Sequence, residues 1–284
     1  MAHLLPDTLE TLTYSEANGV ATITLNRPEV YNAFNEKMLH ELRAVWLSLK
    51  TNDSVRCAIL TAAGDKAFCT GIDRNEAMGD GTEAVDGATS SGDNHSVGYD
   101  DPWNFEDPGD WLGPKSNGLW KPVIAAVNGM ACGGAFYLLG ECEFIISAEH
   151  ATYFDPHVTF GMTAAFEPIH LLDKMPFHEV MRMSLLGSSE RISAQRAHQV
   201  GFVSEVVPSD QLMASAVWAA EQIAAAPMLA TMGTVRALWT GLELSRKQAL
   251  DLMYLYTNVG NSPDSLAEGQ RRFTSGERIE WRLR

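Results

Sequence analysis

The stretch VNGMACGGAFYLL, residues 127–139, changes character at its paired glycines. Residues that favour a buried strand precede Gly133-Gly134, and residues that favour a helix follow them. The first turn of a helix has backbone N–H groups without intrahelical partners, and glycine has no Cβ to keep a ligand away from them. The stretch therefore predicts a strand–turn–helix junction whose bare backbone can donate to a polarised oxygen.

Another junction of the same kind lies earlier in the chain and is the first of the two in chain order. The stretch AFCTGIDR, residues 67–74, also follows an apolar run and also combines small residues with a glycine. One backbone N–H can stabilise a developing oxyanion, and two donors from different loops stabilise it better. A Gly-Gly pair alone also occurs where elements only pack tightly, so the prediction depends on the two junctions together.

The segments around these junctions predict an α/β fold with mainly parallel strands. Two alternating segments joined at Asn18-Gly19 predict a hairpin. Short apolar runs at residues 55–62, 122–129 and 143–148 predict buried strands. Because helical and loop segments separate these runs, parallel pairing is favoured.

The two ends of the chain and one internal segment predict its organisation. We expect residues 1–208 to form the α/β core. Residues 209–284 have apolar residues at helical spacing, which predicts a helical region that caps the core, mediates oligomerisation, or does both. Residues 79–118 form an insert rich in Asp, Glu and Gly, and its first half has a disordered composition. Its second half is aromatic, so we expect that half to pack near the site entrance as part of a lid.

Charge and composition exclude several functional classes. The 284-residue chain has a net charge of −15, which argues against nucleic-acid binding because that function needs a basic surface. It has no apolar run of about 18 residues for a membrane span and no N-terminal signal pattern. The cysteines form no C-x-x-C pair, and the histidines form no metal-binding pattern. We expect a cytoplasmic protein without a metal.

Five stretches together resemble the enoyl-CoA hydratase/isomerase (crotonase) superfamily in their order and spacing. They are TLNRPEVYNAFN at residues 24–35, GDKAFCTGID at 64–73, KPVIAAVNGMACGGAF at 121–136, CEFIISAEHATYFDPHVTFG at 142–161 and LLGSSERISAQRAHQVGFVSEVVP at 185–208. The resemblance implies a spiral core of ββα turns. It also implies a C-terminal helical trimerisation region, and hence a homotrimer or a dimer of trimers.

The resemblance further implies an acyl-CoA substrate, with CoA as part of the substrate and no separate cofactor. Two backbone N–H groups would hold the thioester oxygen and stabilise an enolate, those of Ile72 and Gly134. Arg27, Lys66 and Arg74 are the nearby cations that could hold the CoA. Each of these three is equally compatible with ordinary solvated surface charge.

The chain departs from the family at both acid–base positions. Hydratases of the family have one glutamate three residues after the second oxyanion glycine, where this chain has Tyr137. They have the other in a QPE element, which aligns here with Asp155-Pro156-His157. Because both glutamates are absent, other side chains must carry the proton transfers of any hydration.

Four side chains are candidates for that role. A histidine has an ordinary pKa of about 6.5, which suits His157 for proton transfer at neutral pH, and we expect it to act as the base. Asp155 could orient His157, since residues two apart project to the same side of an extended segment. Tyr137 is either a hydrogen-bond donor or a core aromatic. Glu167 is either a catalytic partner or a capping glutamate; it lies about one residue beyond the position of a catalytic carboxylate in other branches of the superfamily.

Three interpretations follow. The first is an enzyme of this superfamily that acts on an acyl-CoA through an oxyanion-stabilised enolate, with His157 in place of a glutamate. The second comes from the superfamily's β-diketone hydrolase branch, which also pairs a histidine in this position with a later carboxylate and cleaves carbon–carbon bonds without CoA. The third is a CoA-binding protein that has kept the fold and lost catalysis.

Overall fold

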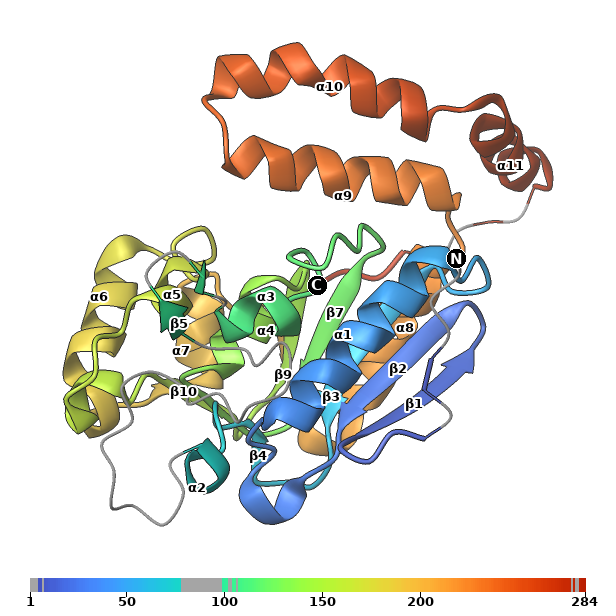
Figure 1. Cartoon of the computed structure of the whole chain (residues 1–284). Coiled ribbons are helices and arrows are strands. Elements are labelled where there is room, and N and C mark those ends of the chain that lie inside the picture. Colours follow the sequence, from blue (N-terminus) through green and yellow to red (C-terminus); the bar gives the residue numbers. More distant parts are fainter. Residues whose placement is uncertain are drawn as a thin grey trace.

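Two β-sheets, with helices packed on them, make up the core of the fold (Figure 1). The computed structural model describes residues 5–6, 8–77, 99–101, 104–105, 107–276, 278 and 281–284. The larger sheet has, in spatial order, β1 (Leu12–Ala17), β2 (Val20–Leu25), β3 (Cys57–Ala62), β7 (Val123–Val127), β9 (Phe144–Ala148) and β12 (Glu205–Val207). The smaller sheet has β11 (Ile192–Ser193), β10 (Thr152–Phe154), β8 (Met130–Cys132) and β4 (Ala67–Cys69). A separate ribbon pairs β5 (Tyr99–Asp101) with β6 (Asn104–Phe105).

The larger sheet contains one antiparallel hairpin and otherwise parallel strands. β1 and β2 are antiparallel and turn at Asn18-Gly19, whose φ angles of 52° and 78° are those that a tight hairpin turn requires. β2, β3, β7, β9 and β12 pair in parallel. Parallel neighbours need long crossover connections, which here contain the helices that cover the sheet. The predicted hairpin and the predicted α/β class are both confirmed.

Helices α1 (Glu36–Thr51) and α8 (Leu212–Ala224) cover opposite faces of the larger sheet (Figure 1). Successive side chains of β3 alternate between the two faces: Leu60 packs in the core that contains α1 residues, and Ile59 packs with α8. α1 begins at Asn35, whose side chain accepts a hydrogen bond from the Met38 N–H at 3.0 Å. α8 lies close to the sheet because the residues it buries are mostly small, Ala216 among them.

The smaller sheet brings three loops to one edge. β4 and β8 pair in parallel, and β8 also pairs in parallel with β10. The carboxyl ends of parallel strands meet at the same edge of a sheet, where ligand sites of α/β folds usually lie. Here β4 leads to Gly71, β8 leads to Gly133-Gly134, and β10 leads to Asp155.

Shorter helices follow these strands or connect them. The α-helices are α2 (Arg74–Ala77), α3 (Pro108–Leu112), α4 (Ala135–Gly140), α5 (Phe166–Ile169), α6 (Phe177–Leu186) and α7 (Ala194–Gln199). The 3₁₀ turns are η1 (Pro28–Val30), η2 (His157–Phe160), η3 (Gly187–Ser189) and η4 (Ser209–Gln211).

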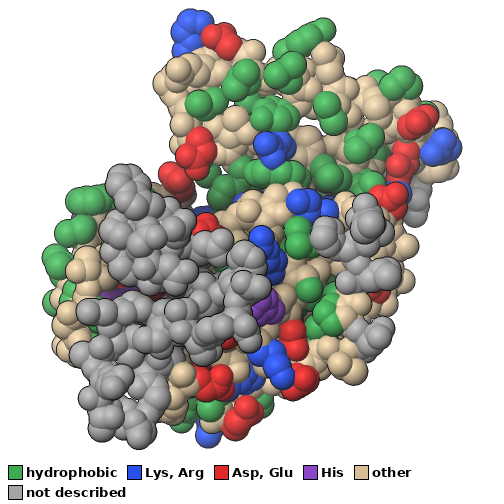
Figure 2. Space-filling view, in the orientation of Figure 1, with side chains coloured by type: hydrophobic (Ala, Val, Ile, Leu, Met, Phe, Trp, Pro, Cys, Tyr) green, Lys and Arg blue, Asp and Glu red, His purple; other side chains and the backbone are tan. Residues whose placement is uncertain are grey.

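The last part of the chain is helical, as predicted, and extends away from the sheets. α9 (Met228–Leu242) and α10 (Arg246–Gly260) pack side by side, and α11 (Pro263–Thr274) follows them (Figure 1). The α9–α10 pair crosses closely at two glycines, since a Cβ on Gly233 would lie only 3.2 Å from the Cα of Gly260. Hydrophobic side chains gather on the surface of this lobe (Figure 2). Its exposed large residues include Leu238, Leu242, Leu250, Tyr254, Leu255 and Val259.

The predicted boundary between residues 208 and 209 precedes α8, which is packed on the sheet. α9 also meets the core, since the Trp239 indole donates to Glu143, next to β9, at 2.8 Å. The division into a core and a helical oligomerisation region stays a prediction. Most of the predicted insert, residues 79–118, lies outside the described residues. Within the described part of the chain no single helix is long and apolar enough to cross a membrane; the segments Ser209–Ala224 and Met228–Leu242 meet that test only as a pair, bent by 107°.

Candidate active site

The two glycine junctions meet at the edge of the smaller sheet. A Cβ on Gly71, whose φ is +84°, would lie 3.0 Å from the Gly134 nitrogen. A Cβ on Gly134 would lie 2.5 Å from the ring of Phe34 and 3.2 Å from the Cα of Gly71. Because side chains at these positions would separate the loops, glycine is required for the approach itself.

Backbone hydrogen bonds fix the first junction around Ile72. The Phe34 N–H donates to the Gly71 carbonyl at 2.9 Å, and the Asp73 N–H donates to the Phe34 carbonyl at 2.8 Å. Ile72 lies between these two bonds, in an isolated parallel bridge with Phe34. Among the described residues neither the Ile72 N–H nor the Gly134 N–H donates a hydrogen bond. Two backbone N–H groups on adjoining loops are thus available to an oxygen atom. Their assignment as an oxyanion hole stays a prediction.

His157 lies beside the second junction and between two carboxylates. A Cβ on Gly133 would lie 3.6 Å from Cε1 of His157. Nδ1 of His157 lies 2.6 Å from Oδ1 of Asp155, and Nε2 lies 3.3 Å from Oε1 of Glu167. Asp155 is fully buried and Glu167 is 7% exposed. The structure therefore brings together three of the four predicted acid–base residues, and the fourth, Tyr137, joins them beside Glu167.

The local backbone explains the short Asp155–His157 contact. The sequence predicted an extended segment here, with both residues on the same side and a bend needed for direct contact. That bend is present, because Pro156 has helical angles (φ −83°, ψ −10°) and His157 begins the 3₁₀ turn η2. The same Asp155 oxygen also accepts from the His157 N–H at 3.0 Å. The other Asp155 oxygen, Oδ2, is buried and has no hydrogen-bond partner within the described residues.

The two carboxylates change the chemistry expected of His157. Hydrogen bonds to Asp155 and then to Glu167 raise the pKa of His157 to about 10, although partial burial acts in the opposite direction. An imidazole that was expected to titrate near neutral pH is therefore an imidazolium there. In that form both ring nitrogens carry hydrogen, so Nε2 of His157 can donate a proton.

Tyr137 stands one helical turn after Gly134, on α4, and its ring is 4% exposed. Its hydroxyl donates to Oδ2 of Asp107 at 3.0 Å and also interacts with the Glu167 carboxylate. Burial, followed by the charges of Glu167 and Asp107, raises the pKa of Tyr137, so the phenol stays neutral. The ring also meets that of His170 edge to face at 5.6 Å. Tyr137 is thus both a buried aromatic and a hydrogen-bonding neighbour of Glu167.

Asp107 is a member of this group that sequence reasoning missed. Its Oδ1 caps α3 by accepting from the Gly109 N–H at 2.8 Å, and its own N–H donates to Asp110 at 3.2 Å. Gly109 permits the approach of α3 to α4, since a Cβ there would lie 2.6 Å from the Tyr137 ring. The pattern Asp-Pro-x-Asp signals a helix cap. It does not reveal that the other carboxylate oxygen points at a tyrosine thirty residues later.

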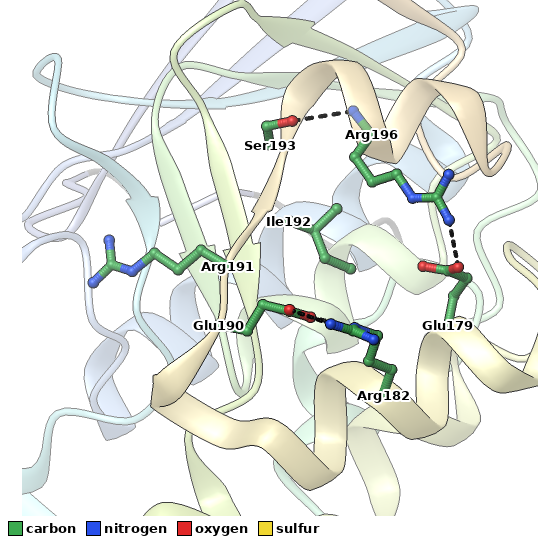
Figure 3. Close-up of a pocket in the computed structure, with 7 residues that line it drawn as sticks. All are labelled: Glu179, Arg182, Glu190, Arg191, Ile192, Ser193 and Arg196. Atoms are coloured by element: carbon green, nitrogen blue, oxygen red, sulfur yellow. Dashed lines mark hydrogen bonds and ion pairs between the residues drawn. The ribbon is translucent and has the colours of Figure 1, made fainter.

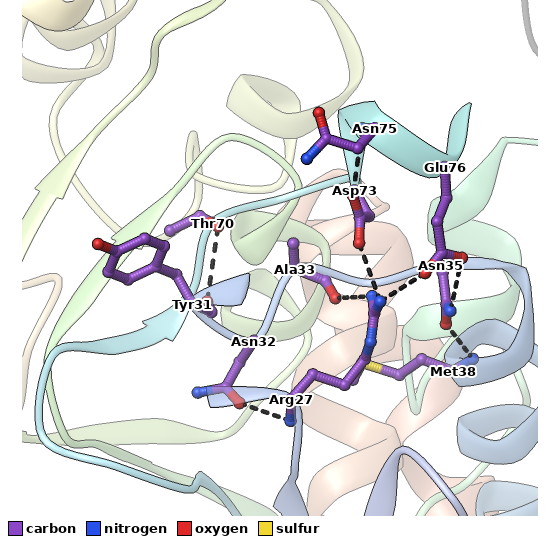
Figure 4. Close-up of polar contacts among 10 residues, drawn as sticks. All are labelled: Arg27, Tyr31, Asn32, Ala33, Asn35, Met38, Thr70, Asp73, Asn75 and Glu76. Atoms are coloured by element: carbon purple, nitrogen blue, oxygen red, sulfur yellow. Dashed lines mark hydrogen bonds and ion pairs between the residues drawn. The ribbon is translucent and has the colours of Figure 1, made fainter. Parts of the chain in front are cut away.

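Arg27, predicted to bind CoA, is engaged in contacts within the protein (Figure 4). Its guanidinium donates to the Ala33 carbonyl at 2.8 Å and lies 2.9 Å from Asp73 and 2.5 Å from Glu76. Its side chain is only 12% exposed. These contacts tie the turn after β2 to the residue that follows Ile72, so Arg27 supports the first junction whether or not it also meets a ligand.

Lys66 and Arg74, the other two predicted CoA contacts, lie at the surface on either side of the first junction. Lys66 is exposed and lines a pocket of about 210 Å³ together with Pro28 and Tyr31. Arg74 is exposed at the start of α2, with its guanidinium 4.8 Å above the ring of Phe160 on η2. The pocket beside Lys66 could admit part of a ligand, and CoA binding by these residues stays a prediction.

A second charged pocket, of about 370 Å³, lies between α6 and the start of α7 (Figure 3). Two of its arginines already face carboxylates: Arg182 makes two hydrogen bonds with Glu190, and Arg196 meets Glu179 at 2.6 Å. The charges of these two arginines are therefore already neutralised within the pocket.

Comparisons with known proteins agree with this geometry. The family model described as enoyl-CoA hydratase/isomerase matches residues 15–97 and 115–282. (E)-Benzylidenesuccinyl-CoA hydratase from Thauera aromatica is 32% identical over 275 residues, which cover 96% of this chain and 97% of that protein. 1,2-Epoxyphenylacetyl-CoA isomerase from Escherichia coli (strain K12) is 30% identical over 258 residues, or 90% of this chain and 92% of that one.

Comparison of the fold with solved structures identifies the same family. The crystal structure of an enoyl-CoA hydratase/isomerase from Mycobacterium paratuberculosis has a TM-score of 0.80 and 32% sequence identity, and the match covers 98% of this chain and 100% of that chain. The sequence match, the fold and the two adjoining glycine junctions agree with one another. This chain is an enzyme of the enoyl-CoA hydratase/isomerase family, within the crotonase superfamily.

Proposed function

We propose that this enzyme adds water to, or removes water from, the Cα–Cβ bond of an acyl-CoA thioester, using an acid and a base unlike the usual glutamate pair. The observation that supports this best is the 3.3 Å pair of His157 Nε2 and Glu167 Oε1 beside the glycine junction. Relatives whose names describe such reactions lend further support: (E)-benzylidenesuccinyl-CoA hydratase and a carnitinyl-CoA dehydratase from Proteus mirabilis, 31% identical over 281 residues.

The backbone supplies the first part of the mechanism. The thioester oxygen accepts hydrogen bonds from the Ile72 and Gly134 N–H groups, which have no other acceptor among the described residues. When water attacks Cβ, negative charge moves to this oxygen as an enolate forms. Fixed donors stabilise that charge without having to reorganise, and this is the largest contribution such sites usually make.

Glu167 and His157 carry the proton transfers. The Glu167 carboxylate takes a proton from water as its oxygen bonds to Cβ, and the His157 imidazolium gives its Nε2 proton to Cα. Glu167 then returns the proton it took to His157 across their short contact, so the enzyme regains its starting state. The net change is the addition of one water molecule, and dehydration is the reverse.

Asp155 and Tyr137 prepare these two groups. The buried Asp155 carboxylate holds His157 through Nδ1 and favours the imidazolium that the acid role requires. Tyr137 presents a neutral hydroxyl to Glu167. His157 therefore replaces a glutamate in position, while Glu167 takes over the role of base.

Lys66 and Arg74 are proposed to hold the phosphates of CoA at the mouth of the site. Both are exposed cations on either side of the Ile72 loop, where a thioester bound by that loop would leave its CoA. Arg27 contributes indirectly, through Asp73 and the shape of the loop.

We also propose a homotrimer or a dimer of trimers. Two separate apolar surfaces support this: that of the α9–α10 lobe and that of the groove of about 810 Å³ between α5 and α6. Two unlike patches on one chain can pair head to tail into a closed ring. The molar mass in solution, measured by light scattering, is expected to be three or six times the 31.1 kDa of the chain. A cytoplasmic location stays a prediction. All four cysteines are free and buried.

The decisive experiment follows hydration of a panel of enoyl-CoA thioesters by the loss of enoyl absorbance. Glu167→Gln and His157→Gln are expected to lower kcat by about 10²-fold or more, because each removes one proton-transfer group. His178→Gln is the matched control: this histidine also lies beside a glutamate, 3.7 Å from Glu179, but is exposed on α6. Activity that survived in both site variants would contradict the acid–base assignment.

The same preparation separates the other two interpretations. Cleavage of a β-diketone without CoA, and no hydration of any thioester, would favour the carbon–carbon hydrolase. A thermal shift with acetoacetyl-CoA but no turnover in either assay would favour a CoA-binding protein without catalysis.

A further inference from the structure

Asp107 reaches the proposed acid–base group from α3, a part of the chain that neither glycine junction contains. Its Oδ1 accepts the capping N–H of Gly109, and its Oδ2 accepts the Tyr137 hydroxyl at 3.0 Å. The two oxygens thus have separate tasks, one in the backbone cap and one in the site. Asp107 makes no ion pair within the described residues.

The number of hydrogens available to Asp107, Tyr137 and Glu167 limits how the hydrogen bonds among them can be arranged. The Tyr137 hydroxyl has one hydrogen, but it lies between two carboxyl groups, those of Asp107 and Glu167. If both carboxyls are ionised, the phenol can donate to only one, and the other presents its negative charge to the phenol oxygen. One additional proton removes this conflict. It allows one carboxyl to donate to the phenol while the phenol donates to the other.

The surroundings indicate which carboxyl holds that proton. Glu167 lies 3.3 Å from Nε2 of the His157 imidazolium, so its carboxyl group is paired with a cation. Asp107 has no such cation. The groups that face it or its partner are Tyr137 on α4, Glu167 on α5, Asp110 on its own helix, and His170, whose ring lies against that of Tyr137. Burial is the largest influence on the Asp107 carboxyl and raises its pKa; the hydrogen bonds from Gly109 and Tyr137 act in the opposite direction, and the charges of Glu167 and Asp110 raise the pKa further.

We propose that Asp107 is a positioning residue that keeps a proton at neutral pH, donates it in a hydrogen bond to the Tyr137 oxygen, and so turns the Tyr137 hydroxyl toward Glu167. This inference rests on the proposed role of Glu167 as base. Glu167 then accepts from two donors, the Tyr137 hydroxyl and His157 Nε2, which fix the orientation of its carboxylate. When Asp107 ionises, the phenol turns away and Glu167 loses one of them.

The matched variants are Asp107→Asn, Asp107→Ala and Asp110→Asn. Asparagine caps helices as well as aspartate, and its amide N–H₂ stands where a protonated carboxyl would donate to Tyr137. Asp107→Ala is expected to lower kcat about ten-fold or more, the usual effect of losing a hydrogen bond to a charged group. Asp107→Asn is expected to restore at least about three-fold of that loss. Its pH profile should lack one declining ionisation step that the wild type and Asp110→Asn retain.

Infrared difference spectroscopy tests the proton without relying on turnover. A carbonyl-stretch band of a protonated carboxyl is expected at neutral pH in the wild type and in Asp110→Asn, and it should be absent from Asp107→Asn. If the band is unchanged by Asp107→Asn, or if that variant keeps the declining step, the inference is overturned. If the band behaves as expected but no enoyl-CoA is hydrated, the proposed function fails while the proton on Asp107 stands.

Discussion

The candidate site has two walls, one formed by the backbone and the other by side chains. One wall is backbone: Gly71-Ile72 and Gly133-Gly134, held together so closely that a Cβ on Gly134 would meet a ring 2.5 Å away. The other wall is made of side chains from α3, α4, α5 and η2, and the sequence resemblance aligns its Tyr137 and His157 with glutamates of the family's hydratases.

This difference shows which part of the site can change. Any side chain added to the backbone wall moves its donors, so that wall tolerates little variation whatever reaction is catalysed. Side chains of the other wall can be exchanged as long as their replacements can still donate and accept the protons that the reaction transfers. In the proposed mechanism an imidazolium and a displaced carboxylate, supported by a phenol and two aspartates, stand in for two glutamates.

The largest effect is expected from Gly134→Ala, which strikes the backbone wall. The added Cβ would lie 2.5 Å from the Phe34 ring and 3.2 Å from the Cα of Gly71, so the loops must separate. We expect hydration to fall by about 10³-fold, comparable to the loss of an oxyanion donor. Gly241→Ala on α9 is the control, because a Cβ there would have no neighbour within 4 Å. Near-normal rates for Gly134→Ala would show that the backbone wall is not as rigid as described.

The next effect concerns the charge on His157. A neutral base with an ordinary pKa of about 6.5 would make kcat/KM rise through that pH, whereas an imidazolium acid would not. We expect no step there that His157→Gln removes. A rising step near that value that disappears in His157→Gln would return the role of base to His157.

The free energy of unfolding should also depend on the charge of His157. The pKa of His157 is raised to about 10 in the folded protein, so between about pH 6.5 and 10 the folded state holds a proton that the unfolded state releases. The stabilisation is complete below the lower pH and is lost as pH rises through the upper one. Urea unfolding across this range should show the wild type losing stability relative to His157→Gln. Parallel curves would show that His157 is not held as an imidazolium.

Arg27→Lys tests how the backbone wall is supported. A lysine ammonium cannot reach the Ala33 carbonyl, Asp73 and Glu76 with the geometry of a guanidinium. We expect a loss of about 2 kcal/mol in unfolding free energy, together with lower kcat, because bonds to charged partners are lost near Ile72. Arg182→Lys, at an exposed pair with Glu190, serves as the control. A change confined to KM would instead indicate that Arg27 acts on the ligand.

The smallest effect is expected from Lys66→Ala. An exposed cation that meets a CoA phosphate contributes little, so KM should rise by about three-fold at low salt and by less at high salt. Lys247→Ala, an exposed residue paired with Asp251 on α10, should leave KM unchanged. If KM does not respond to Lys66→Ala at low salt, the CoA phosphates lie elsewhere.

The sequence was sufficient where local pattern determines structure. The hairpin at Asn18-Gly19 and the glycine junctions follow from backbone requirements that only a few residue types meet, and the structure has the hairpin as predicted. It was insufficient where a contact depends on a turn that pattern does not specify. Pro156 bends the chain so that Asp155 reaches His157 directly, and Asp107 meets Tyr137 only through the packing of α3 on α4.

The contacts of Arg27 also have a consequence for how the protein can vary. Arginine and lysine codons can differ by a single base, and the two residues have the same charge, so this exchange is among the easiest for a gene to sample. At Arg27 it would keep the surface charge while it releases the segment that shapes the first glycine junction. The effect of a charge-conserving variant at this position therefore depends on whether its side chain can still reach all three acceptors of Arg27.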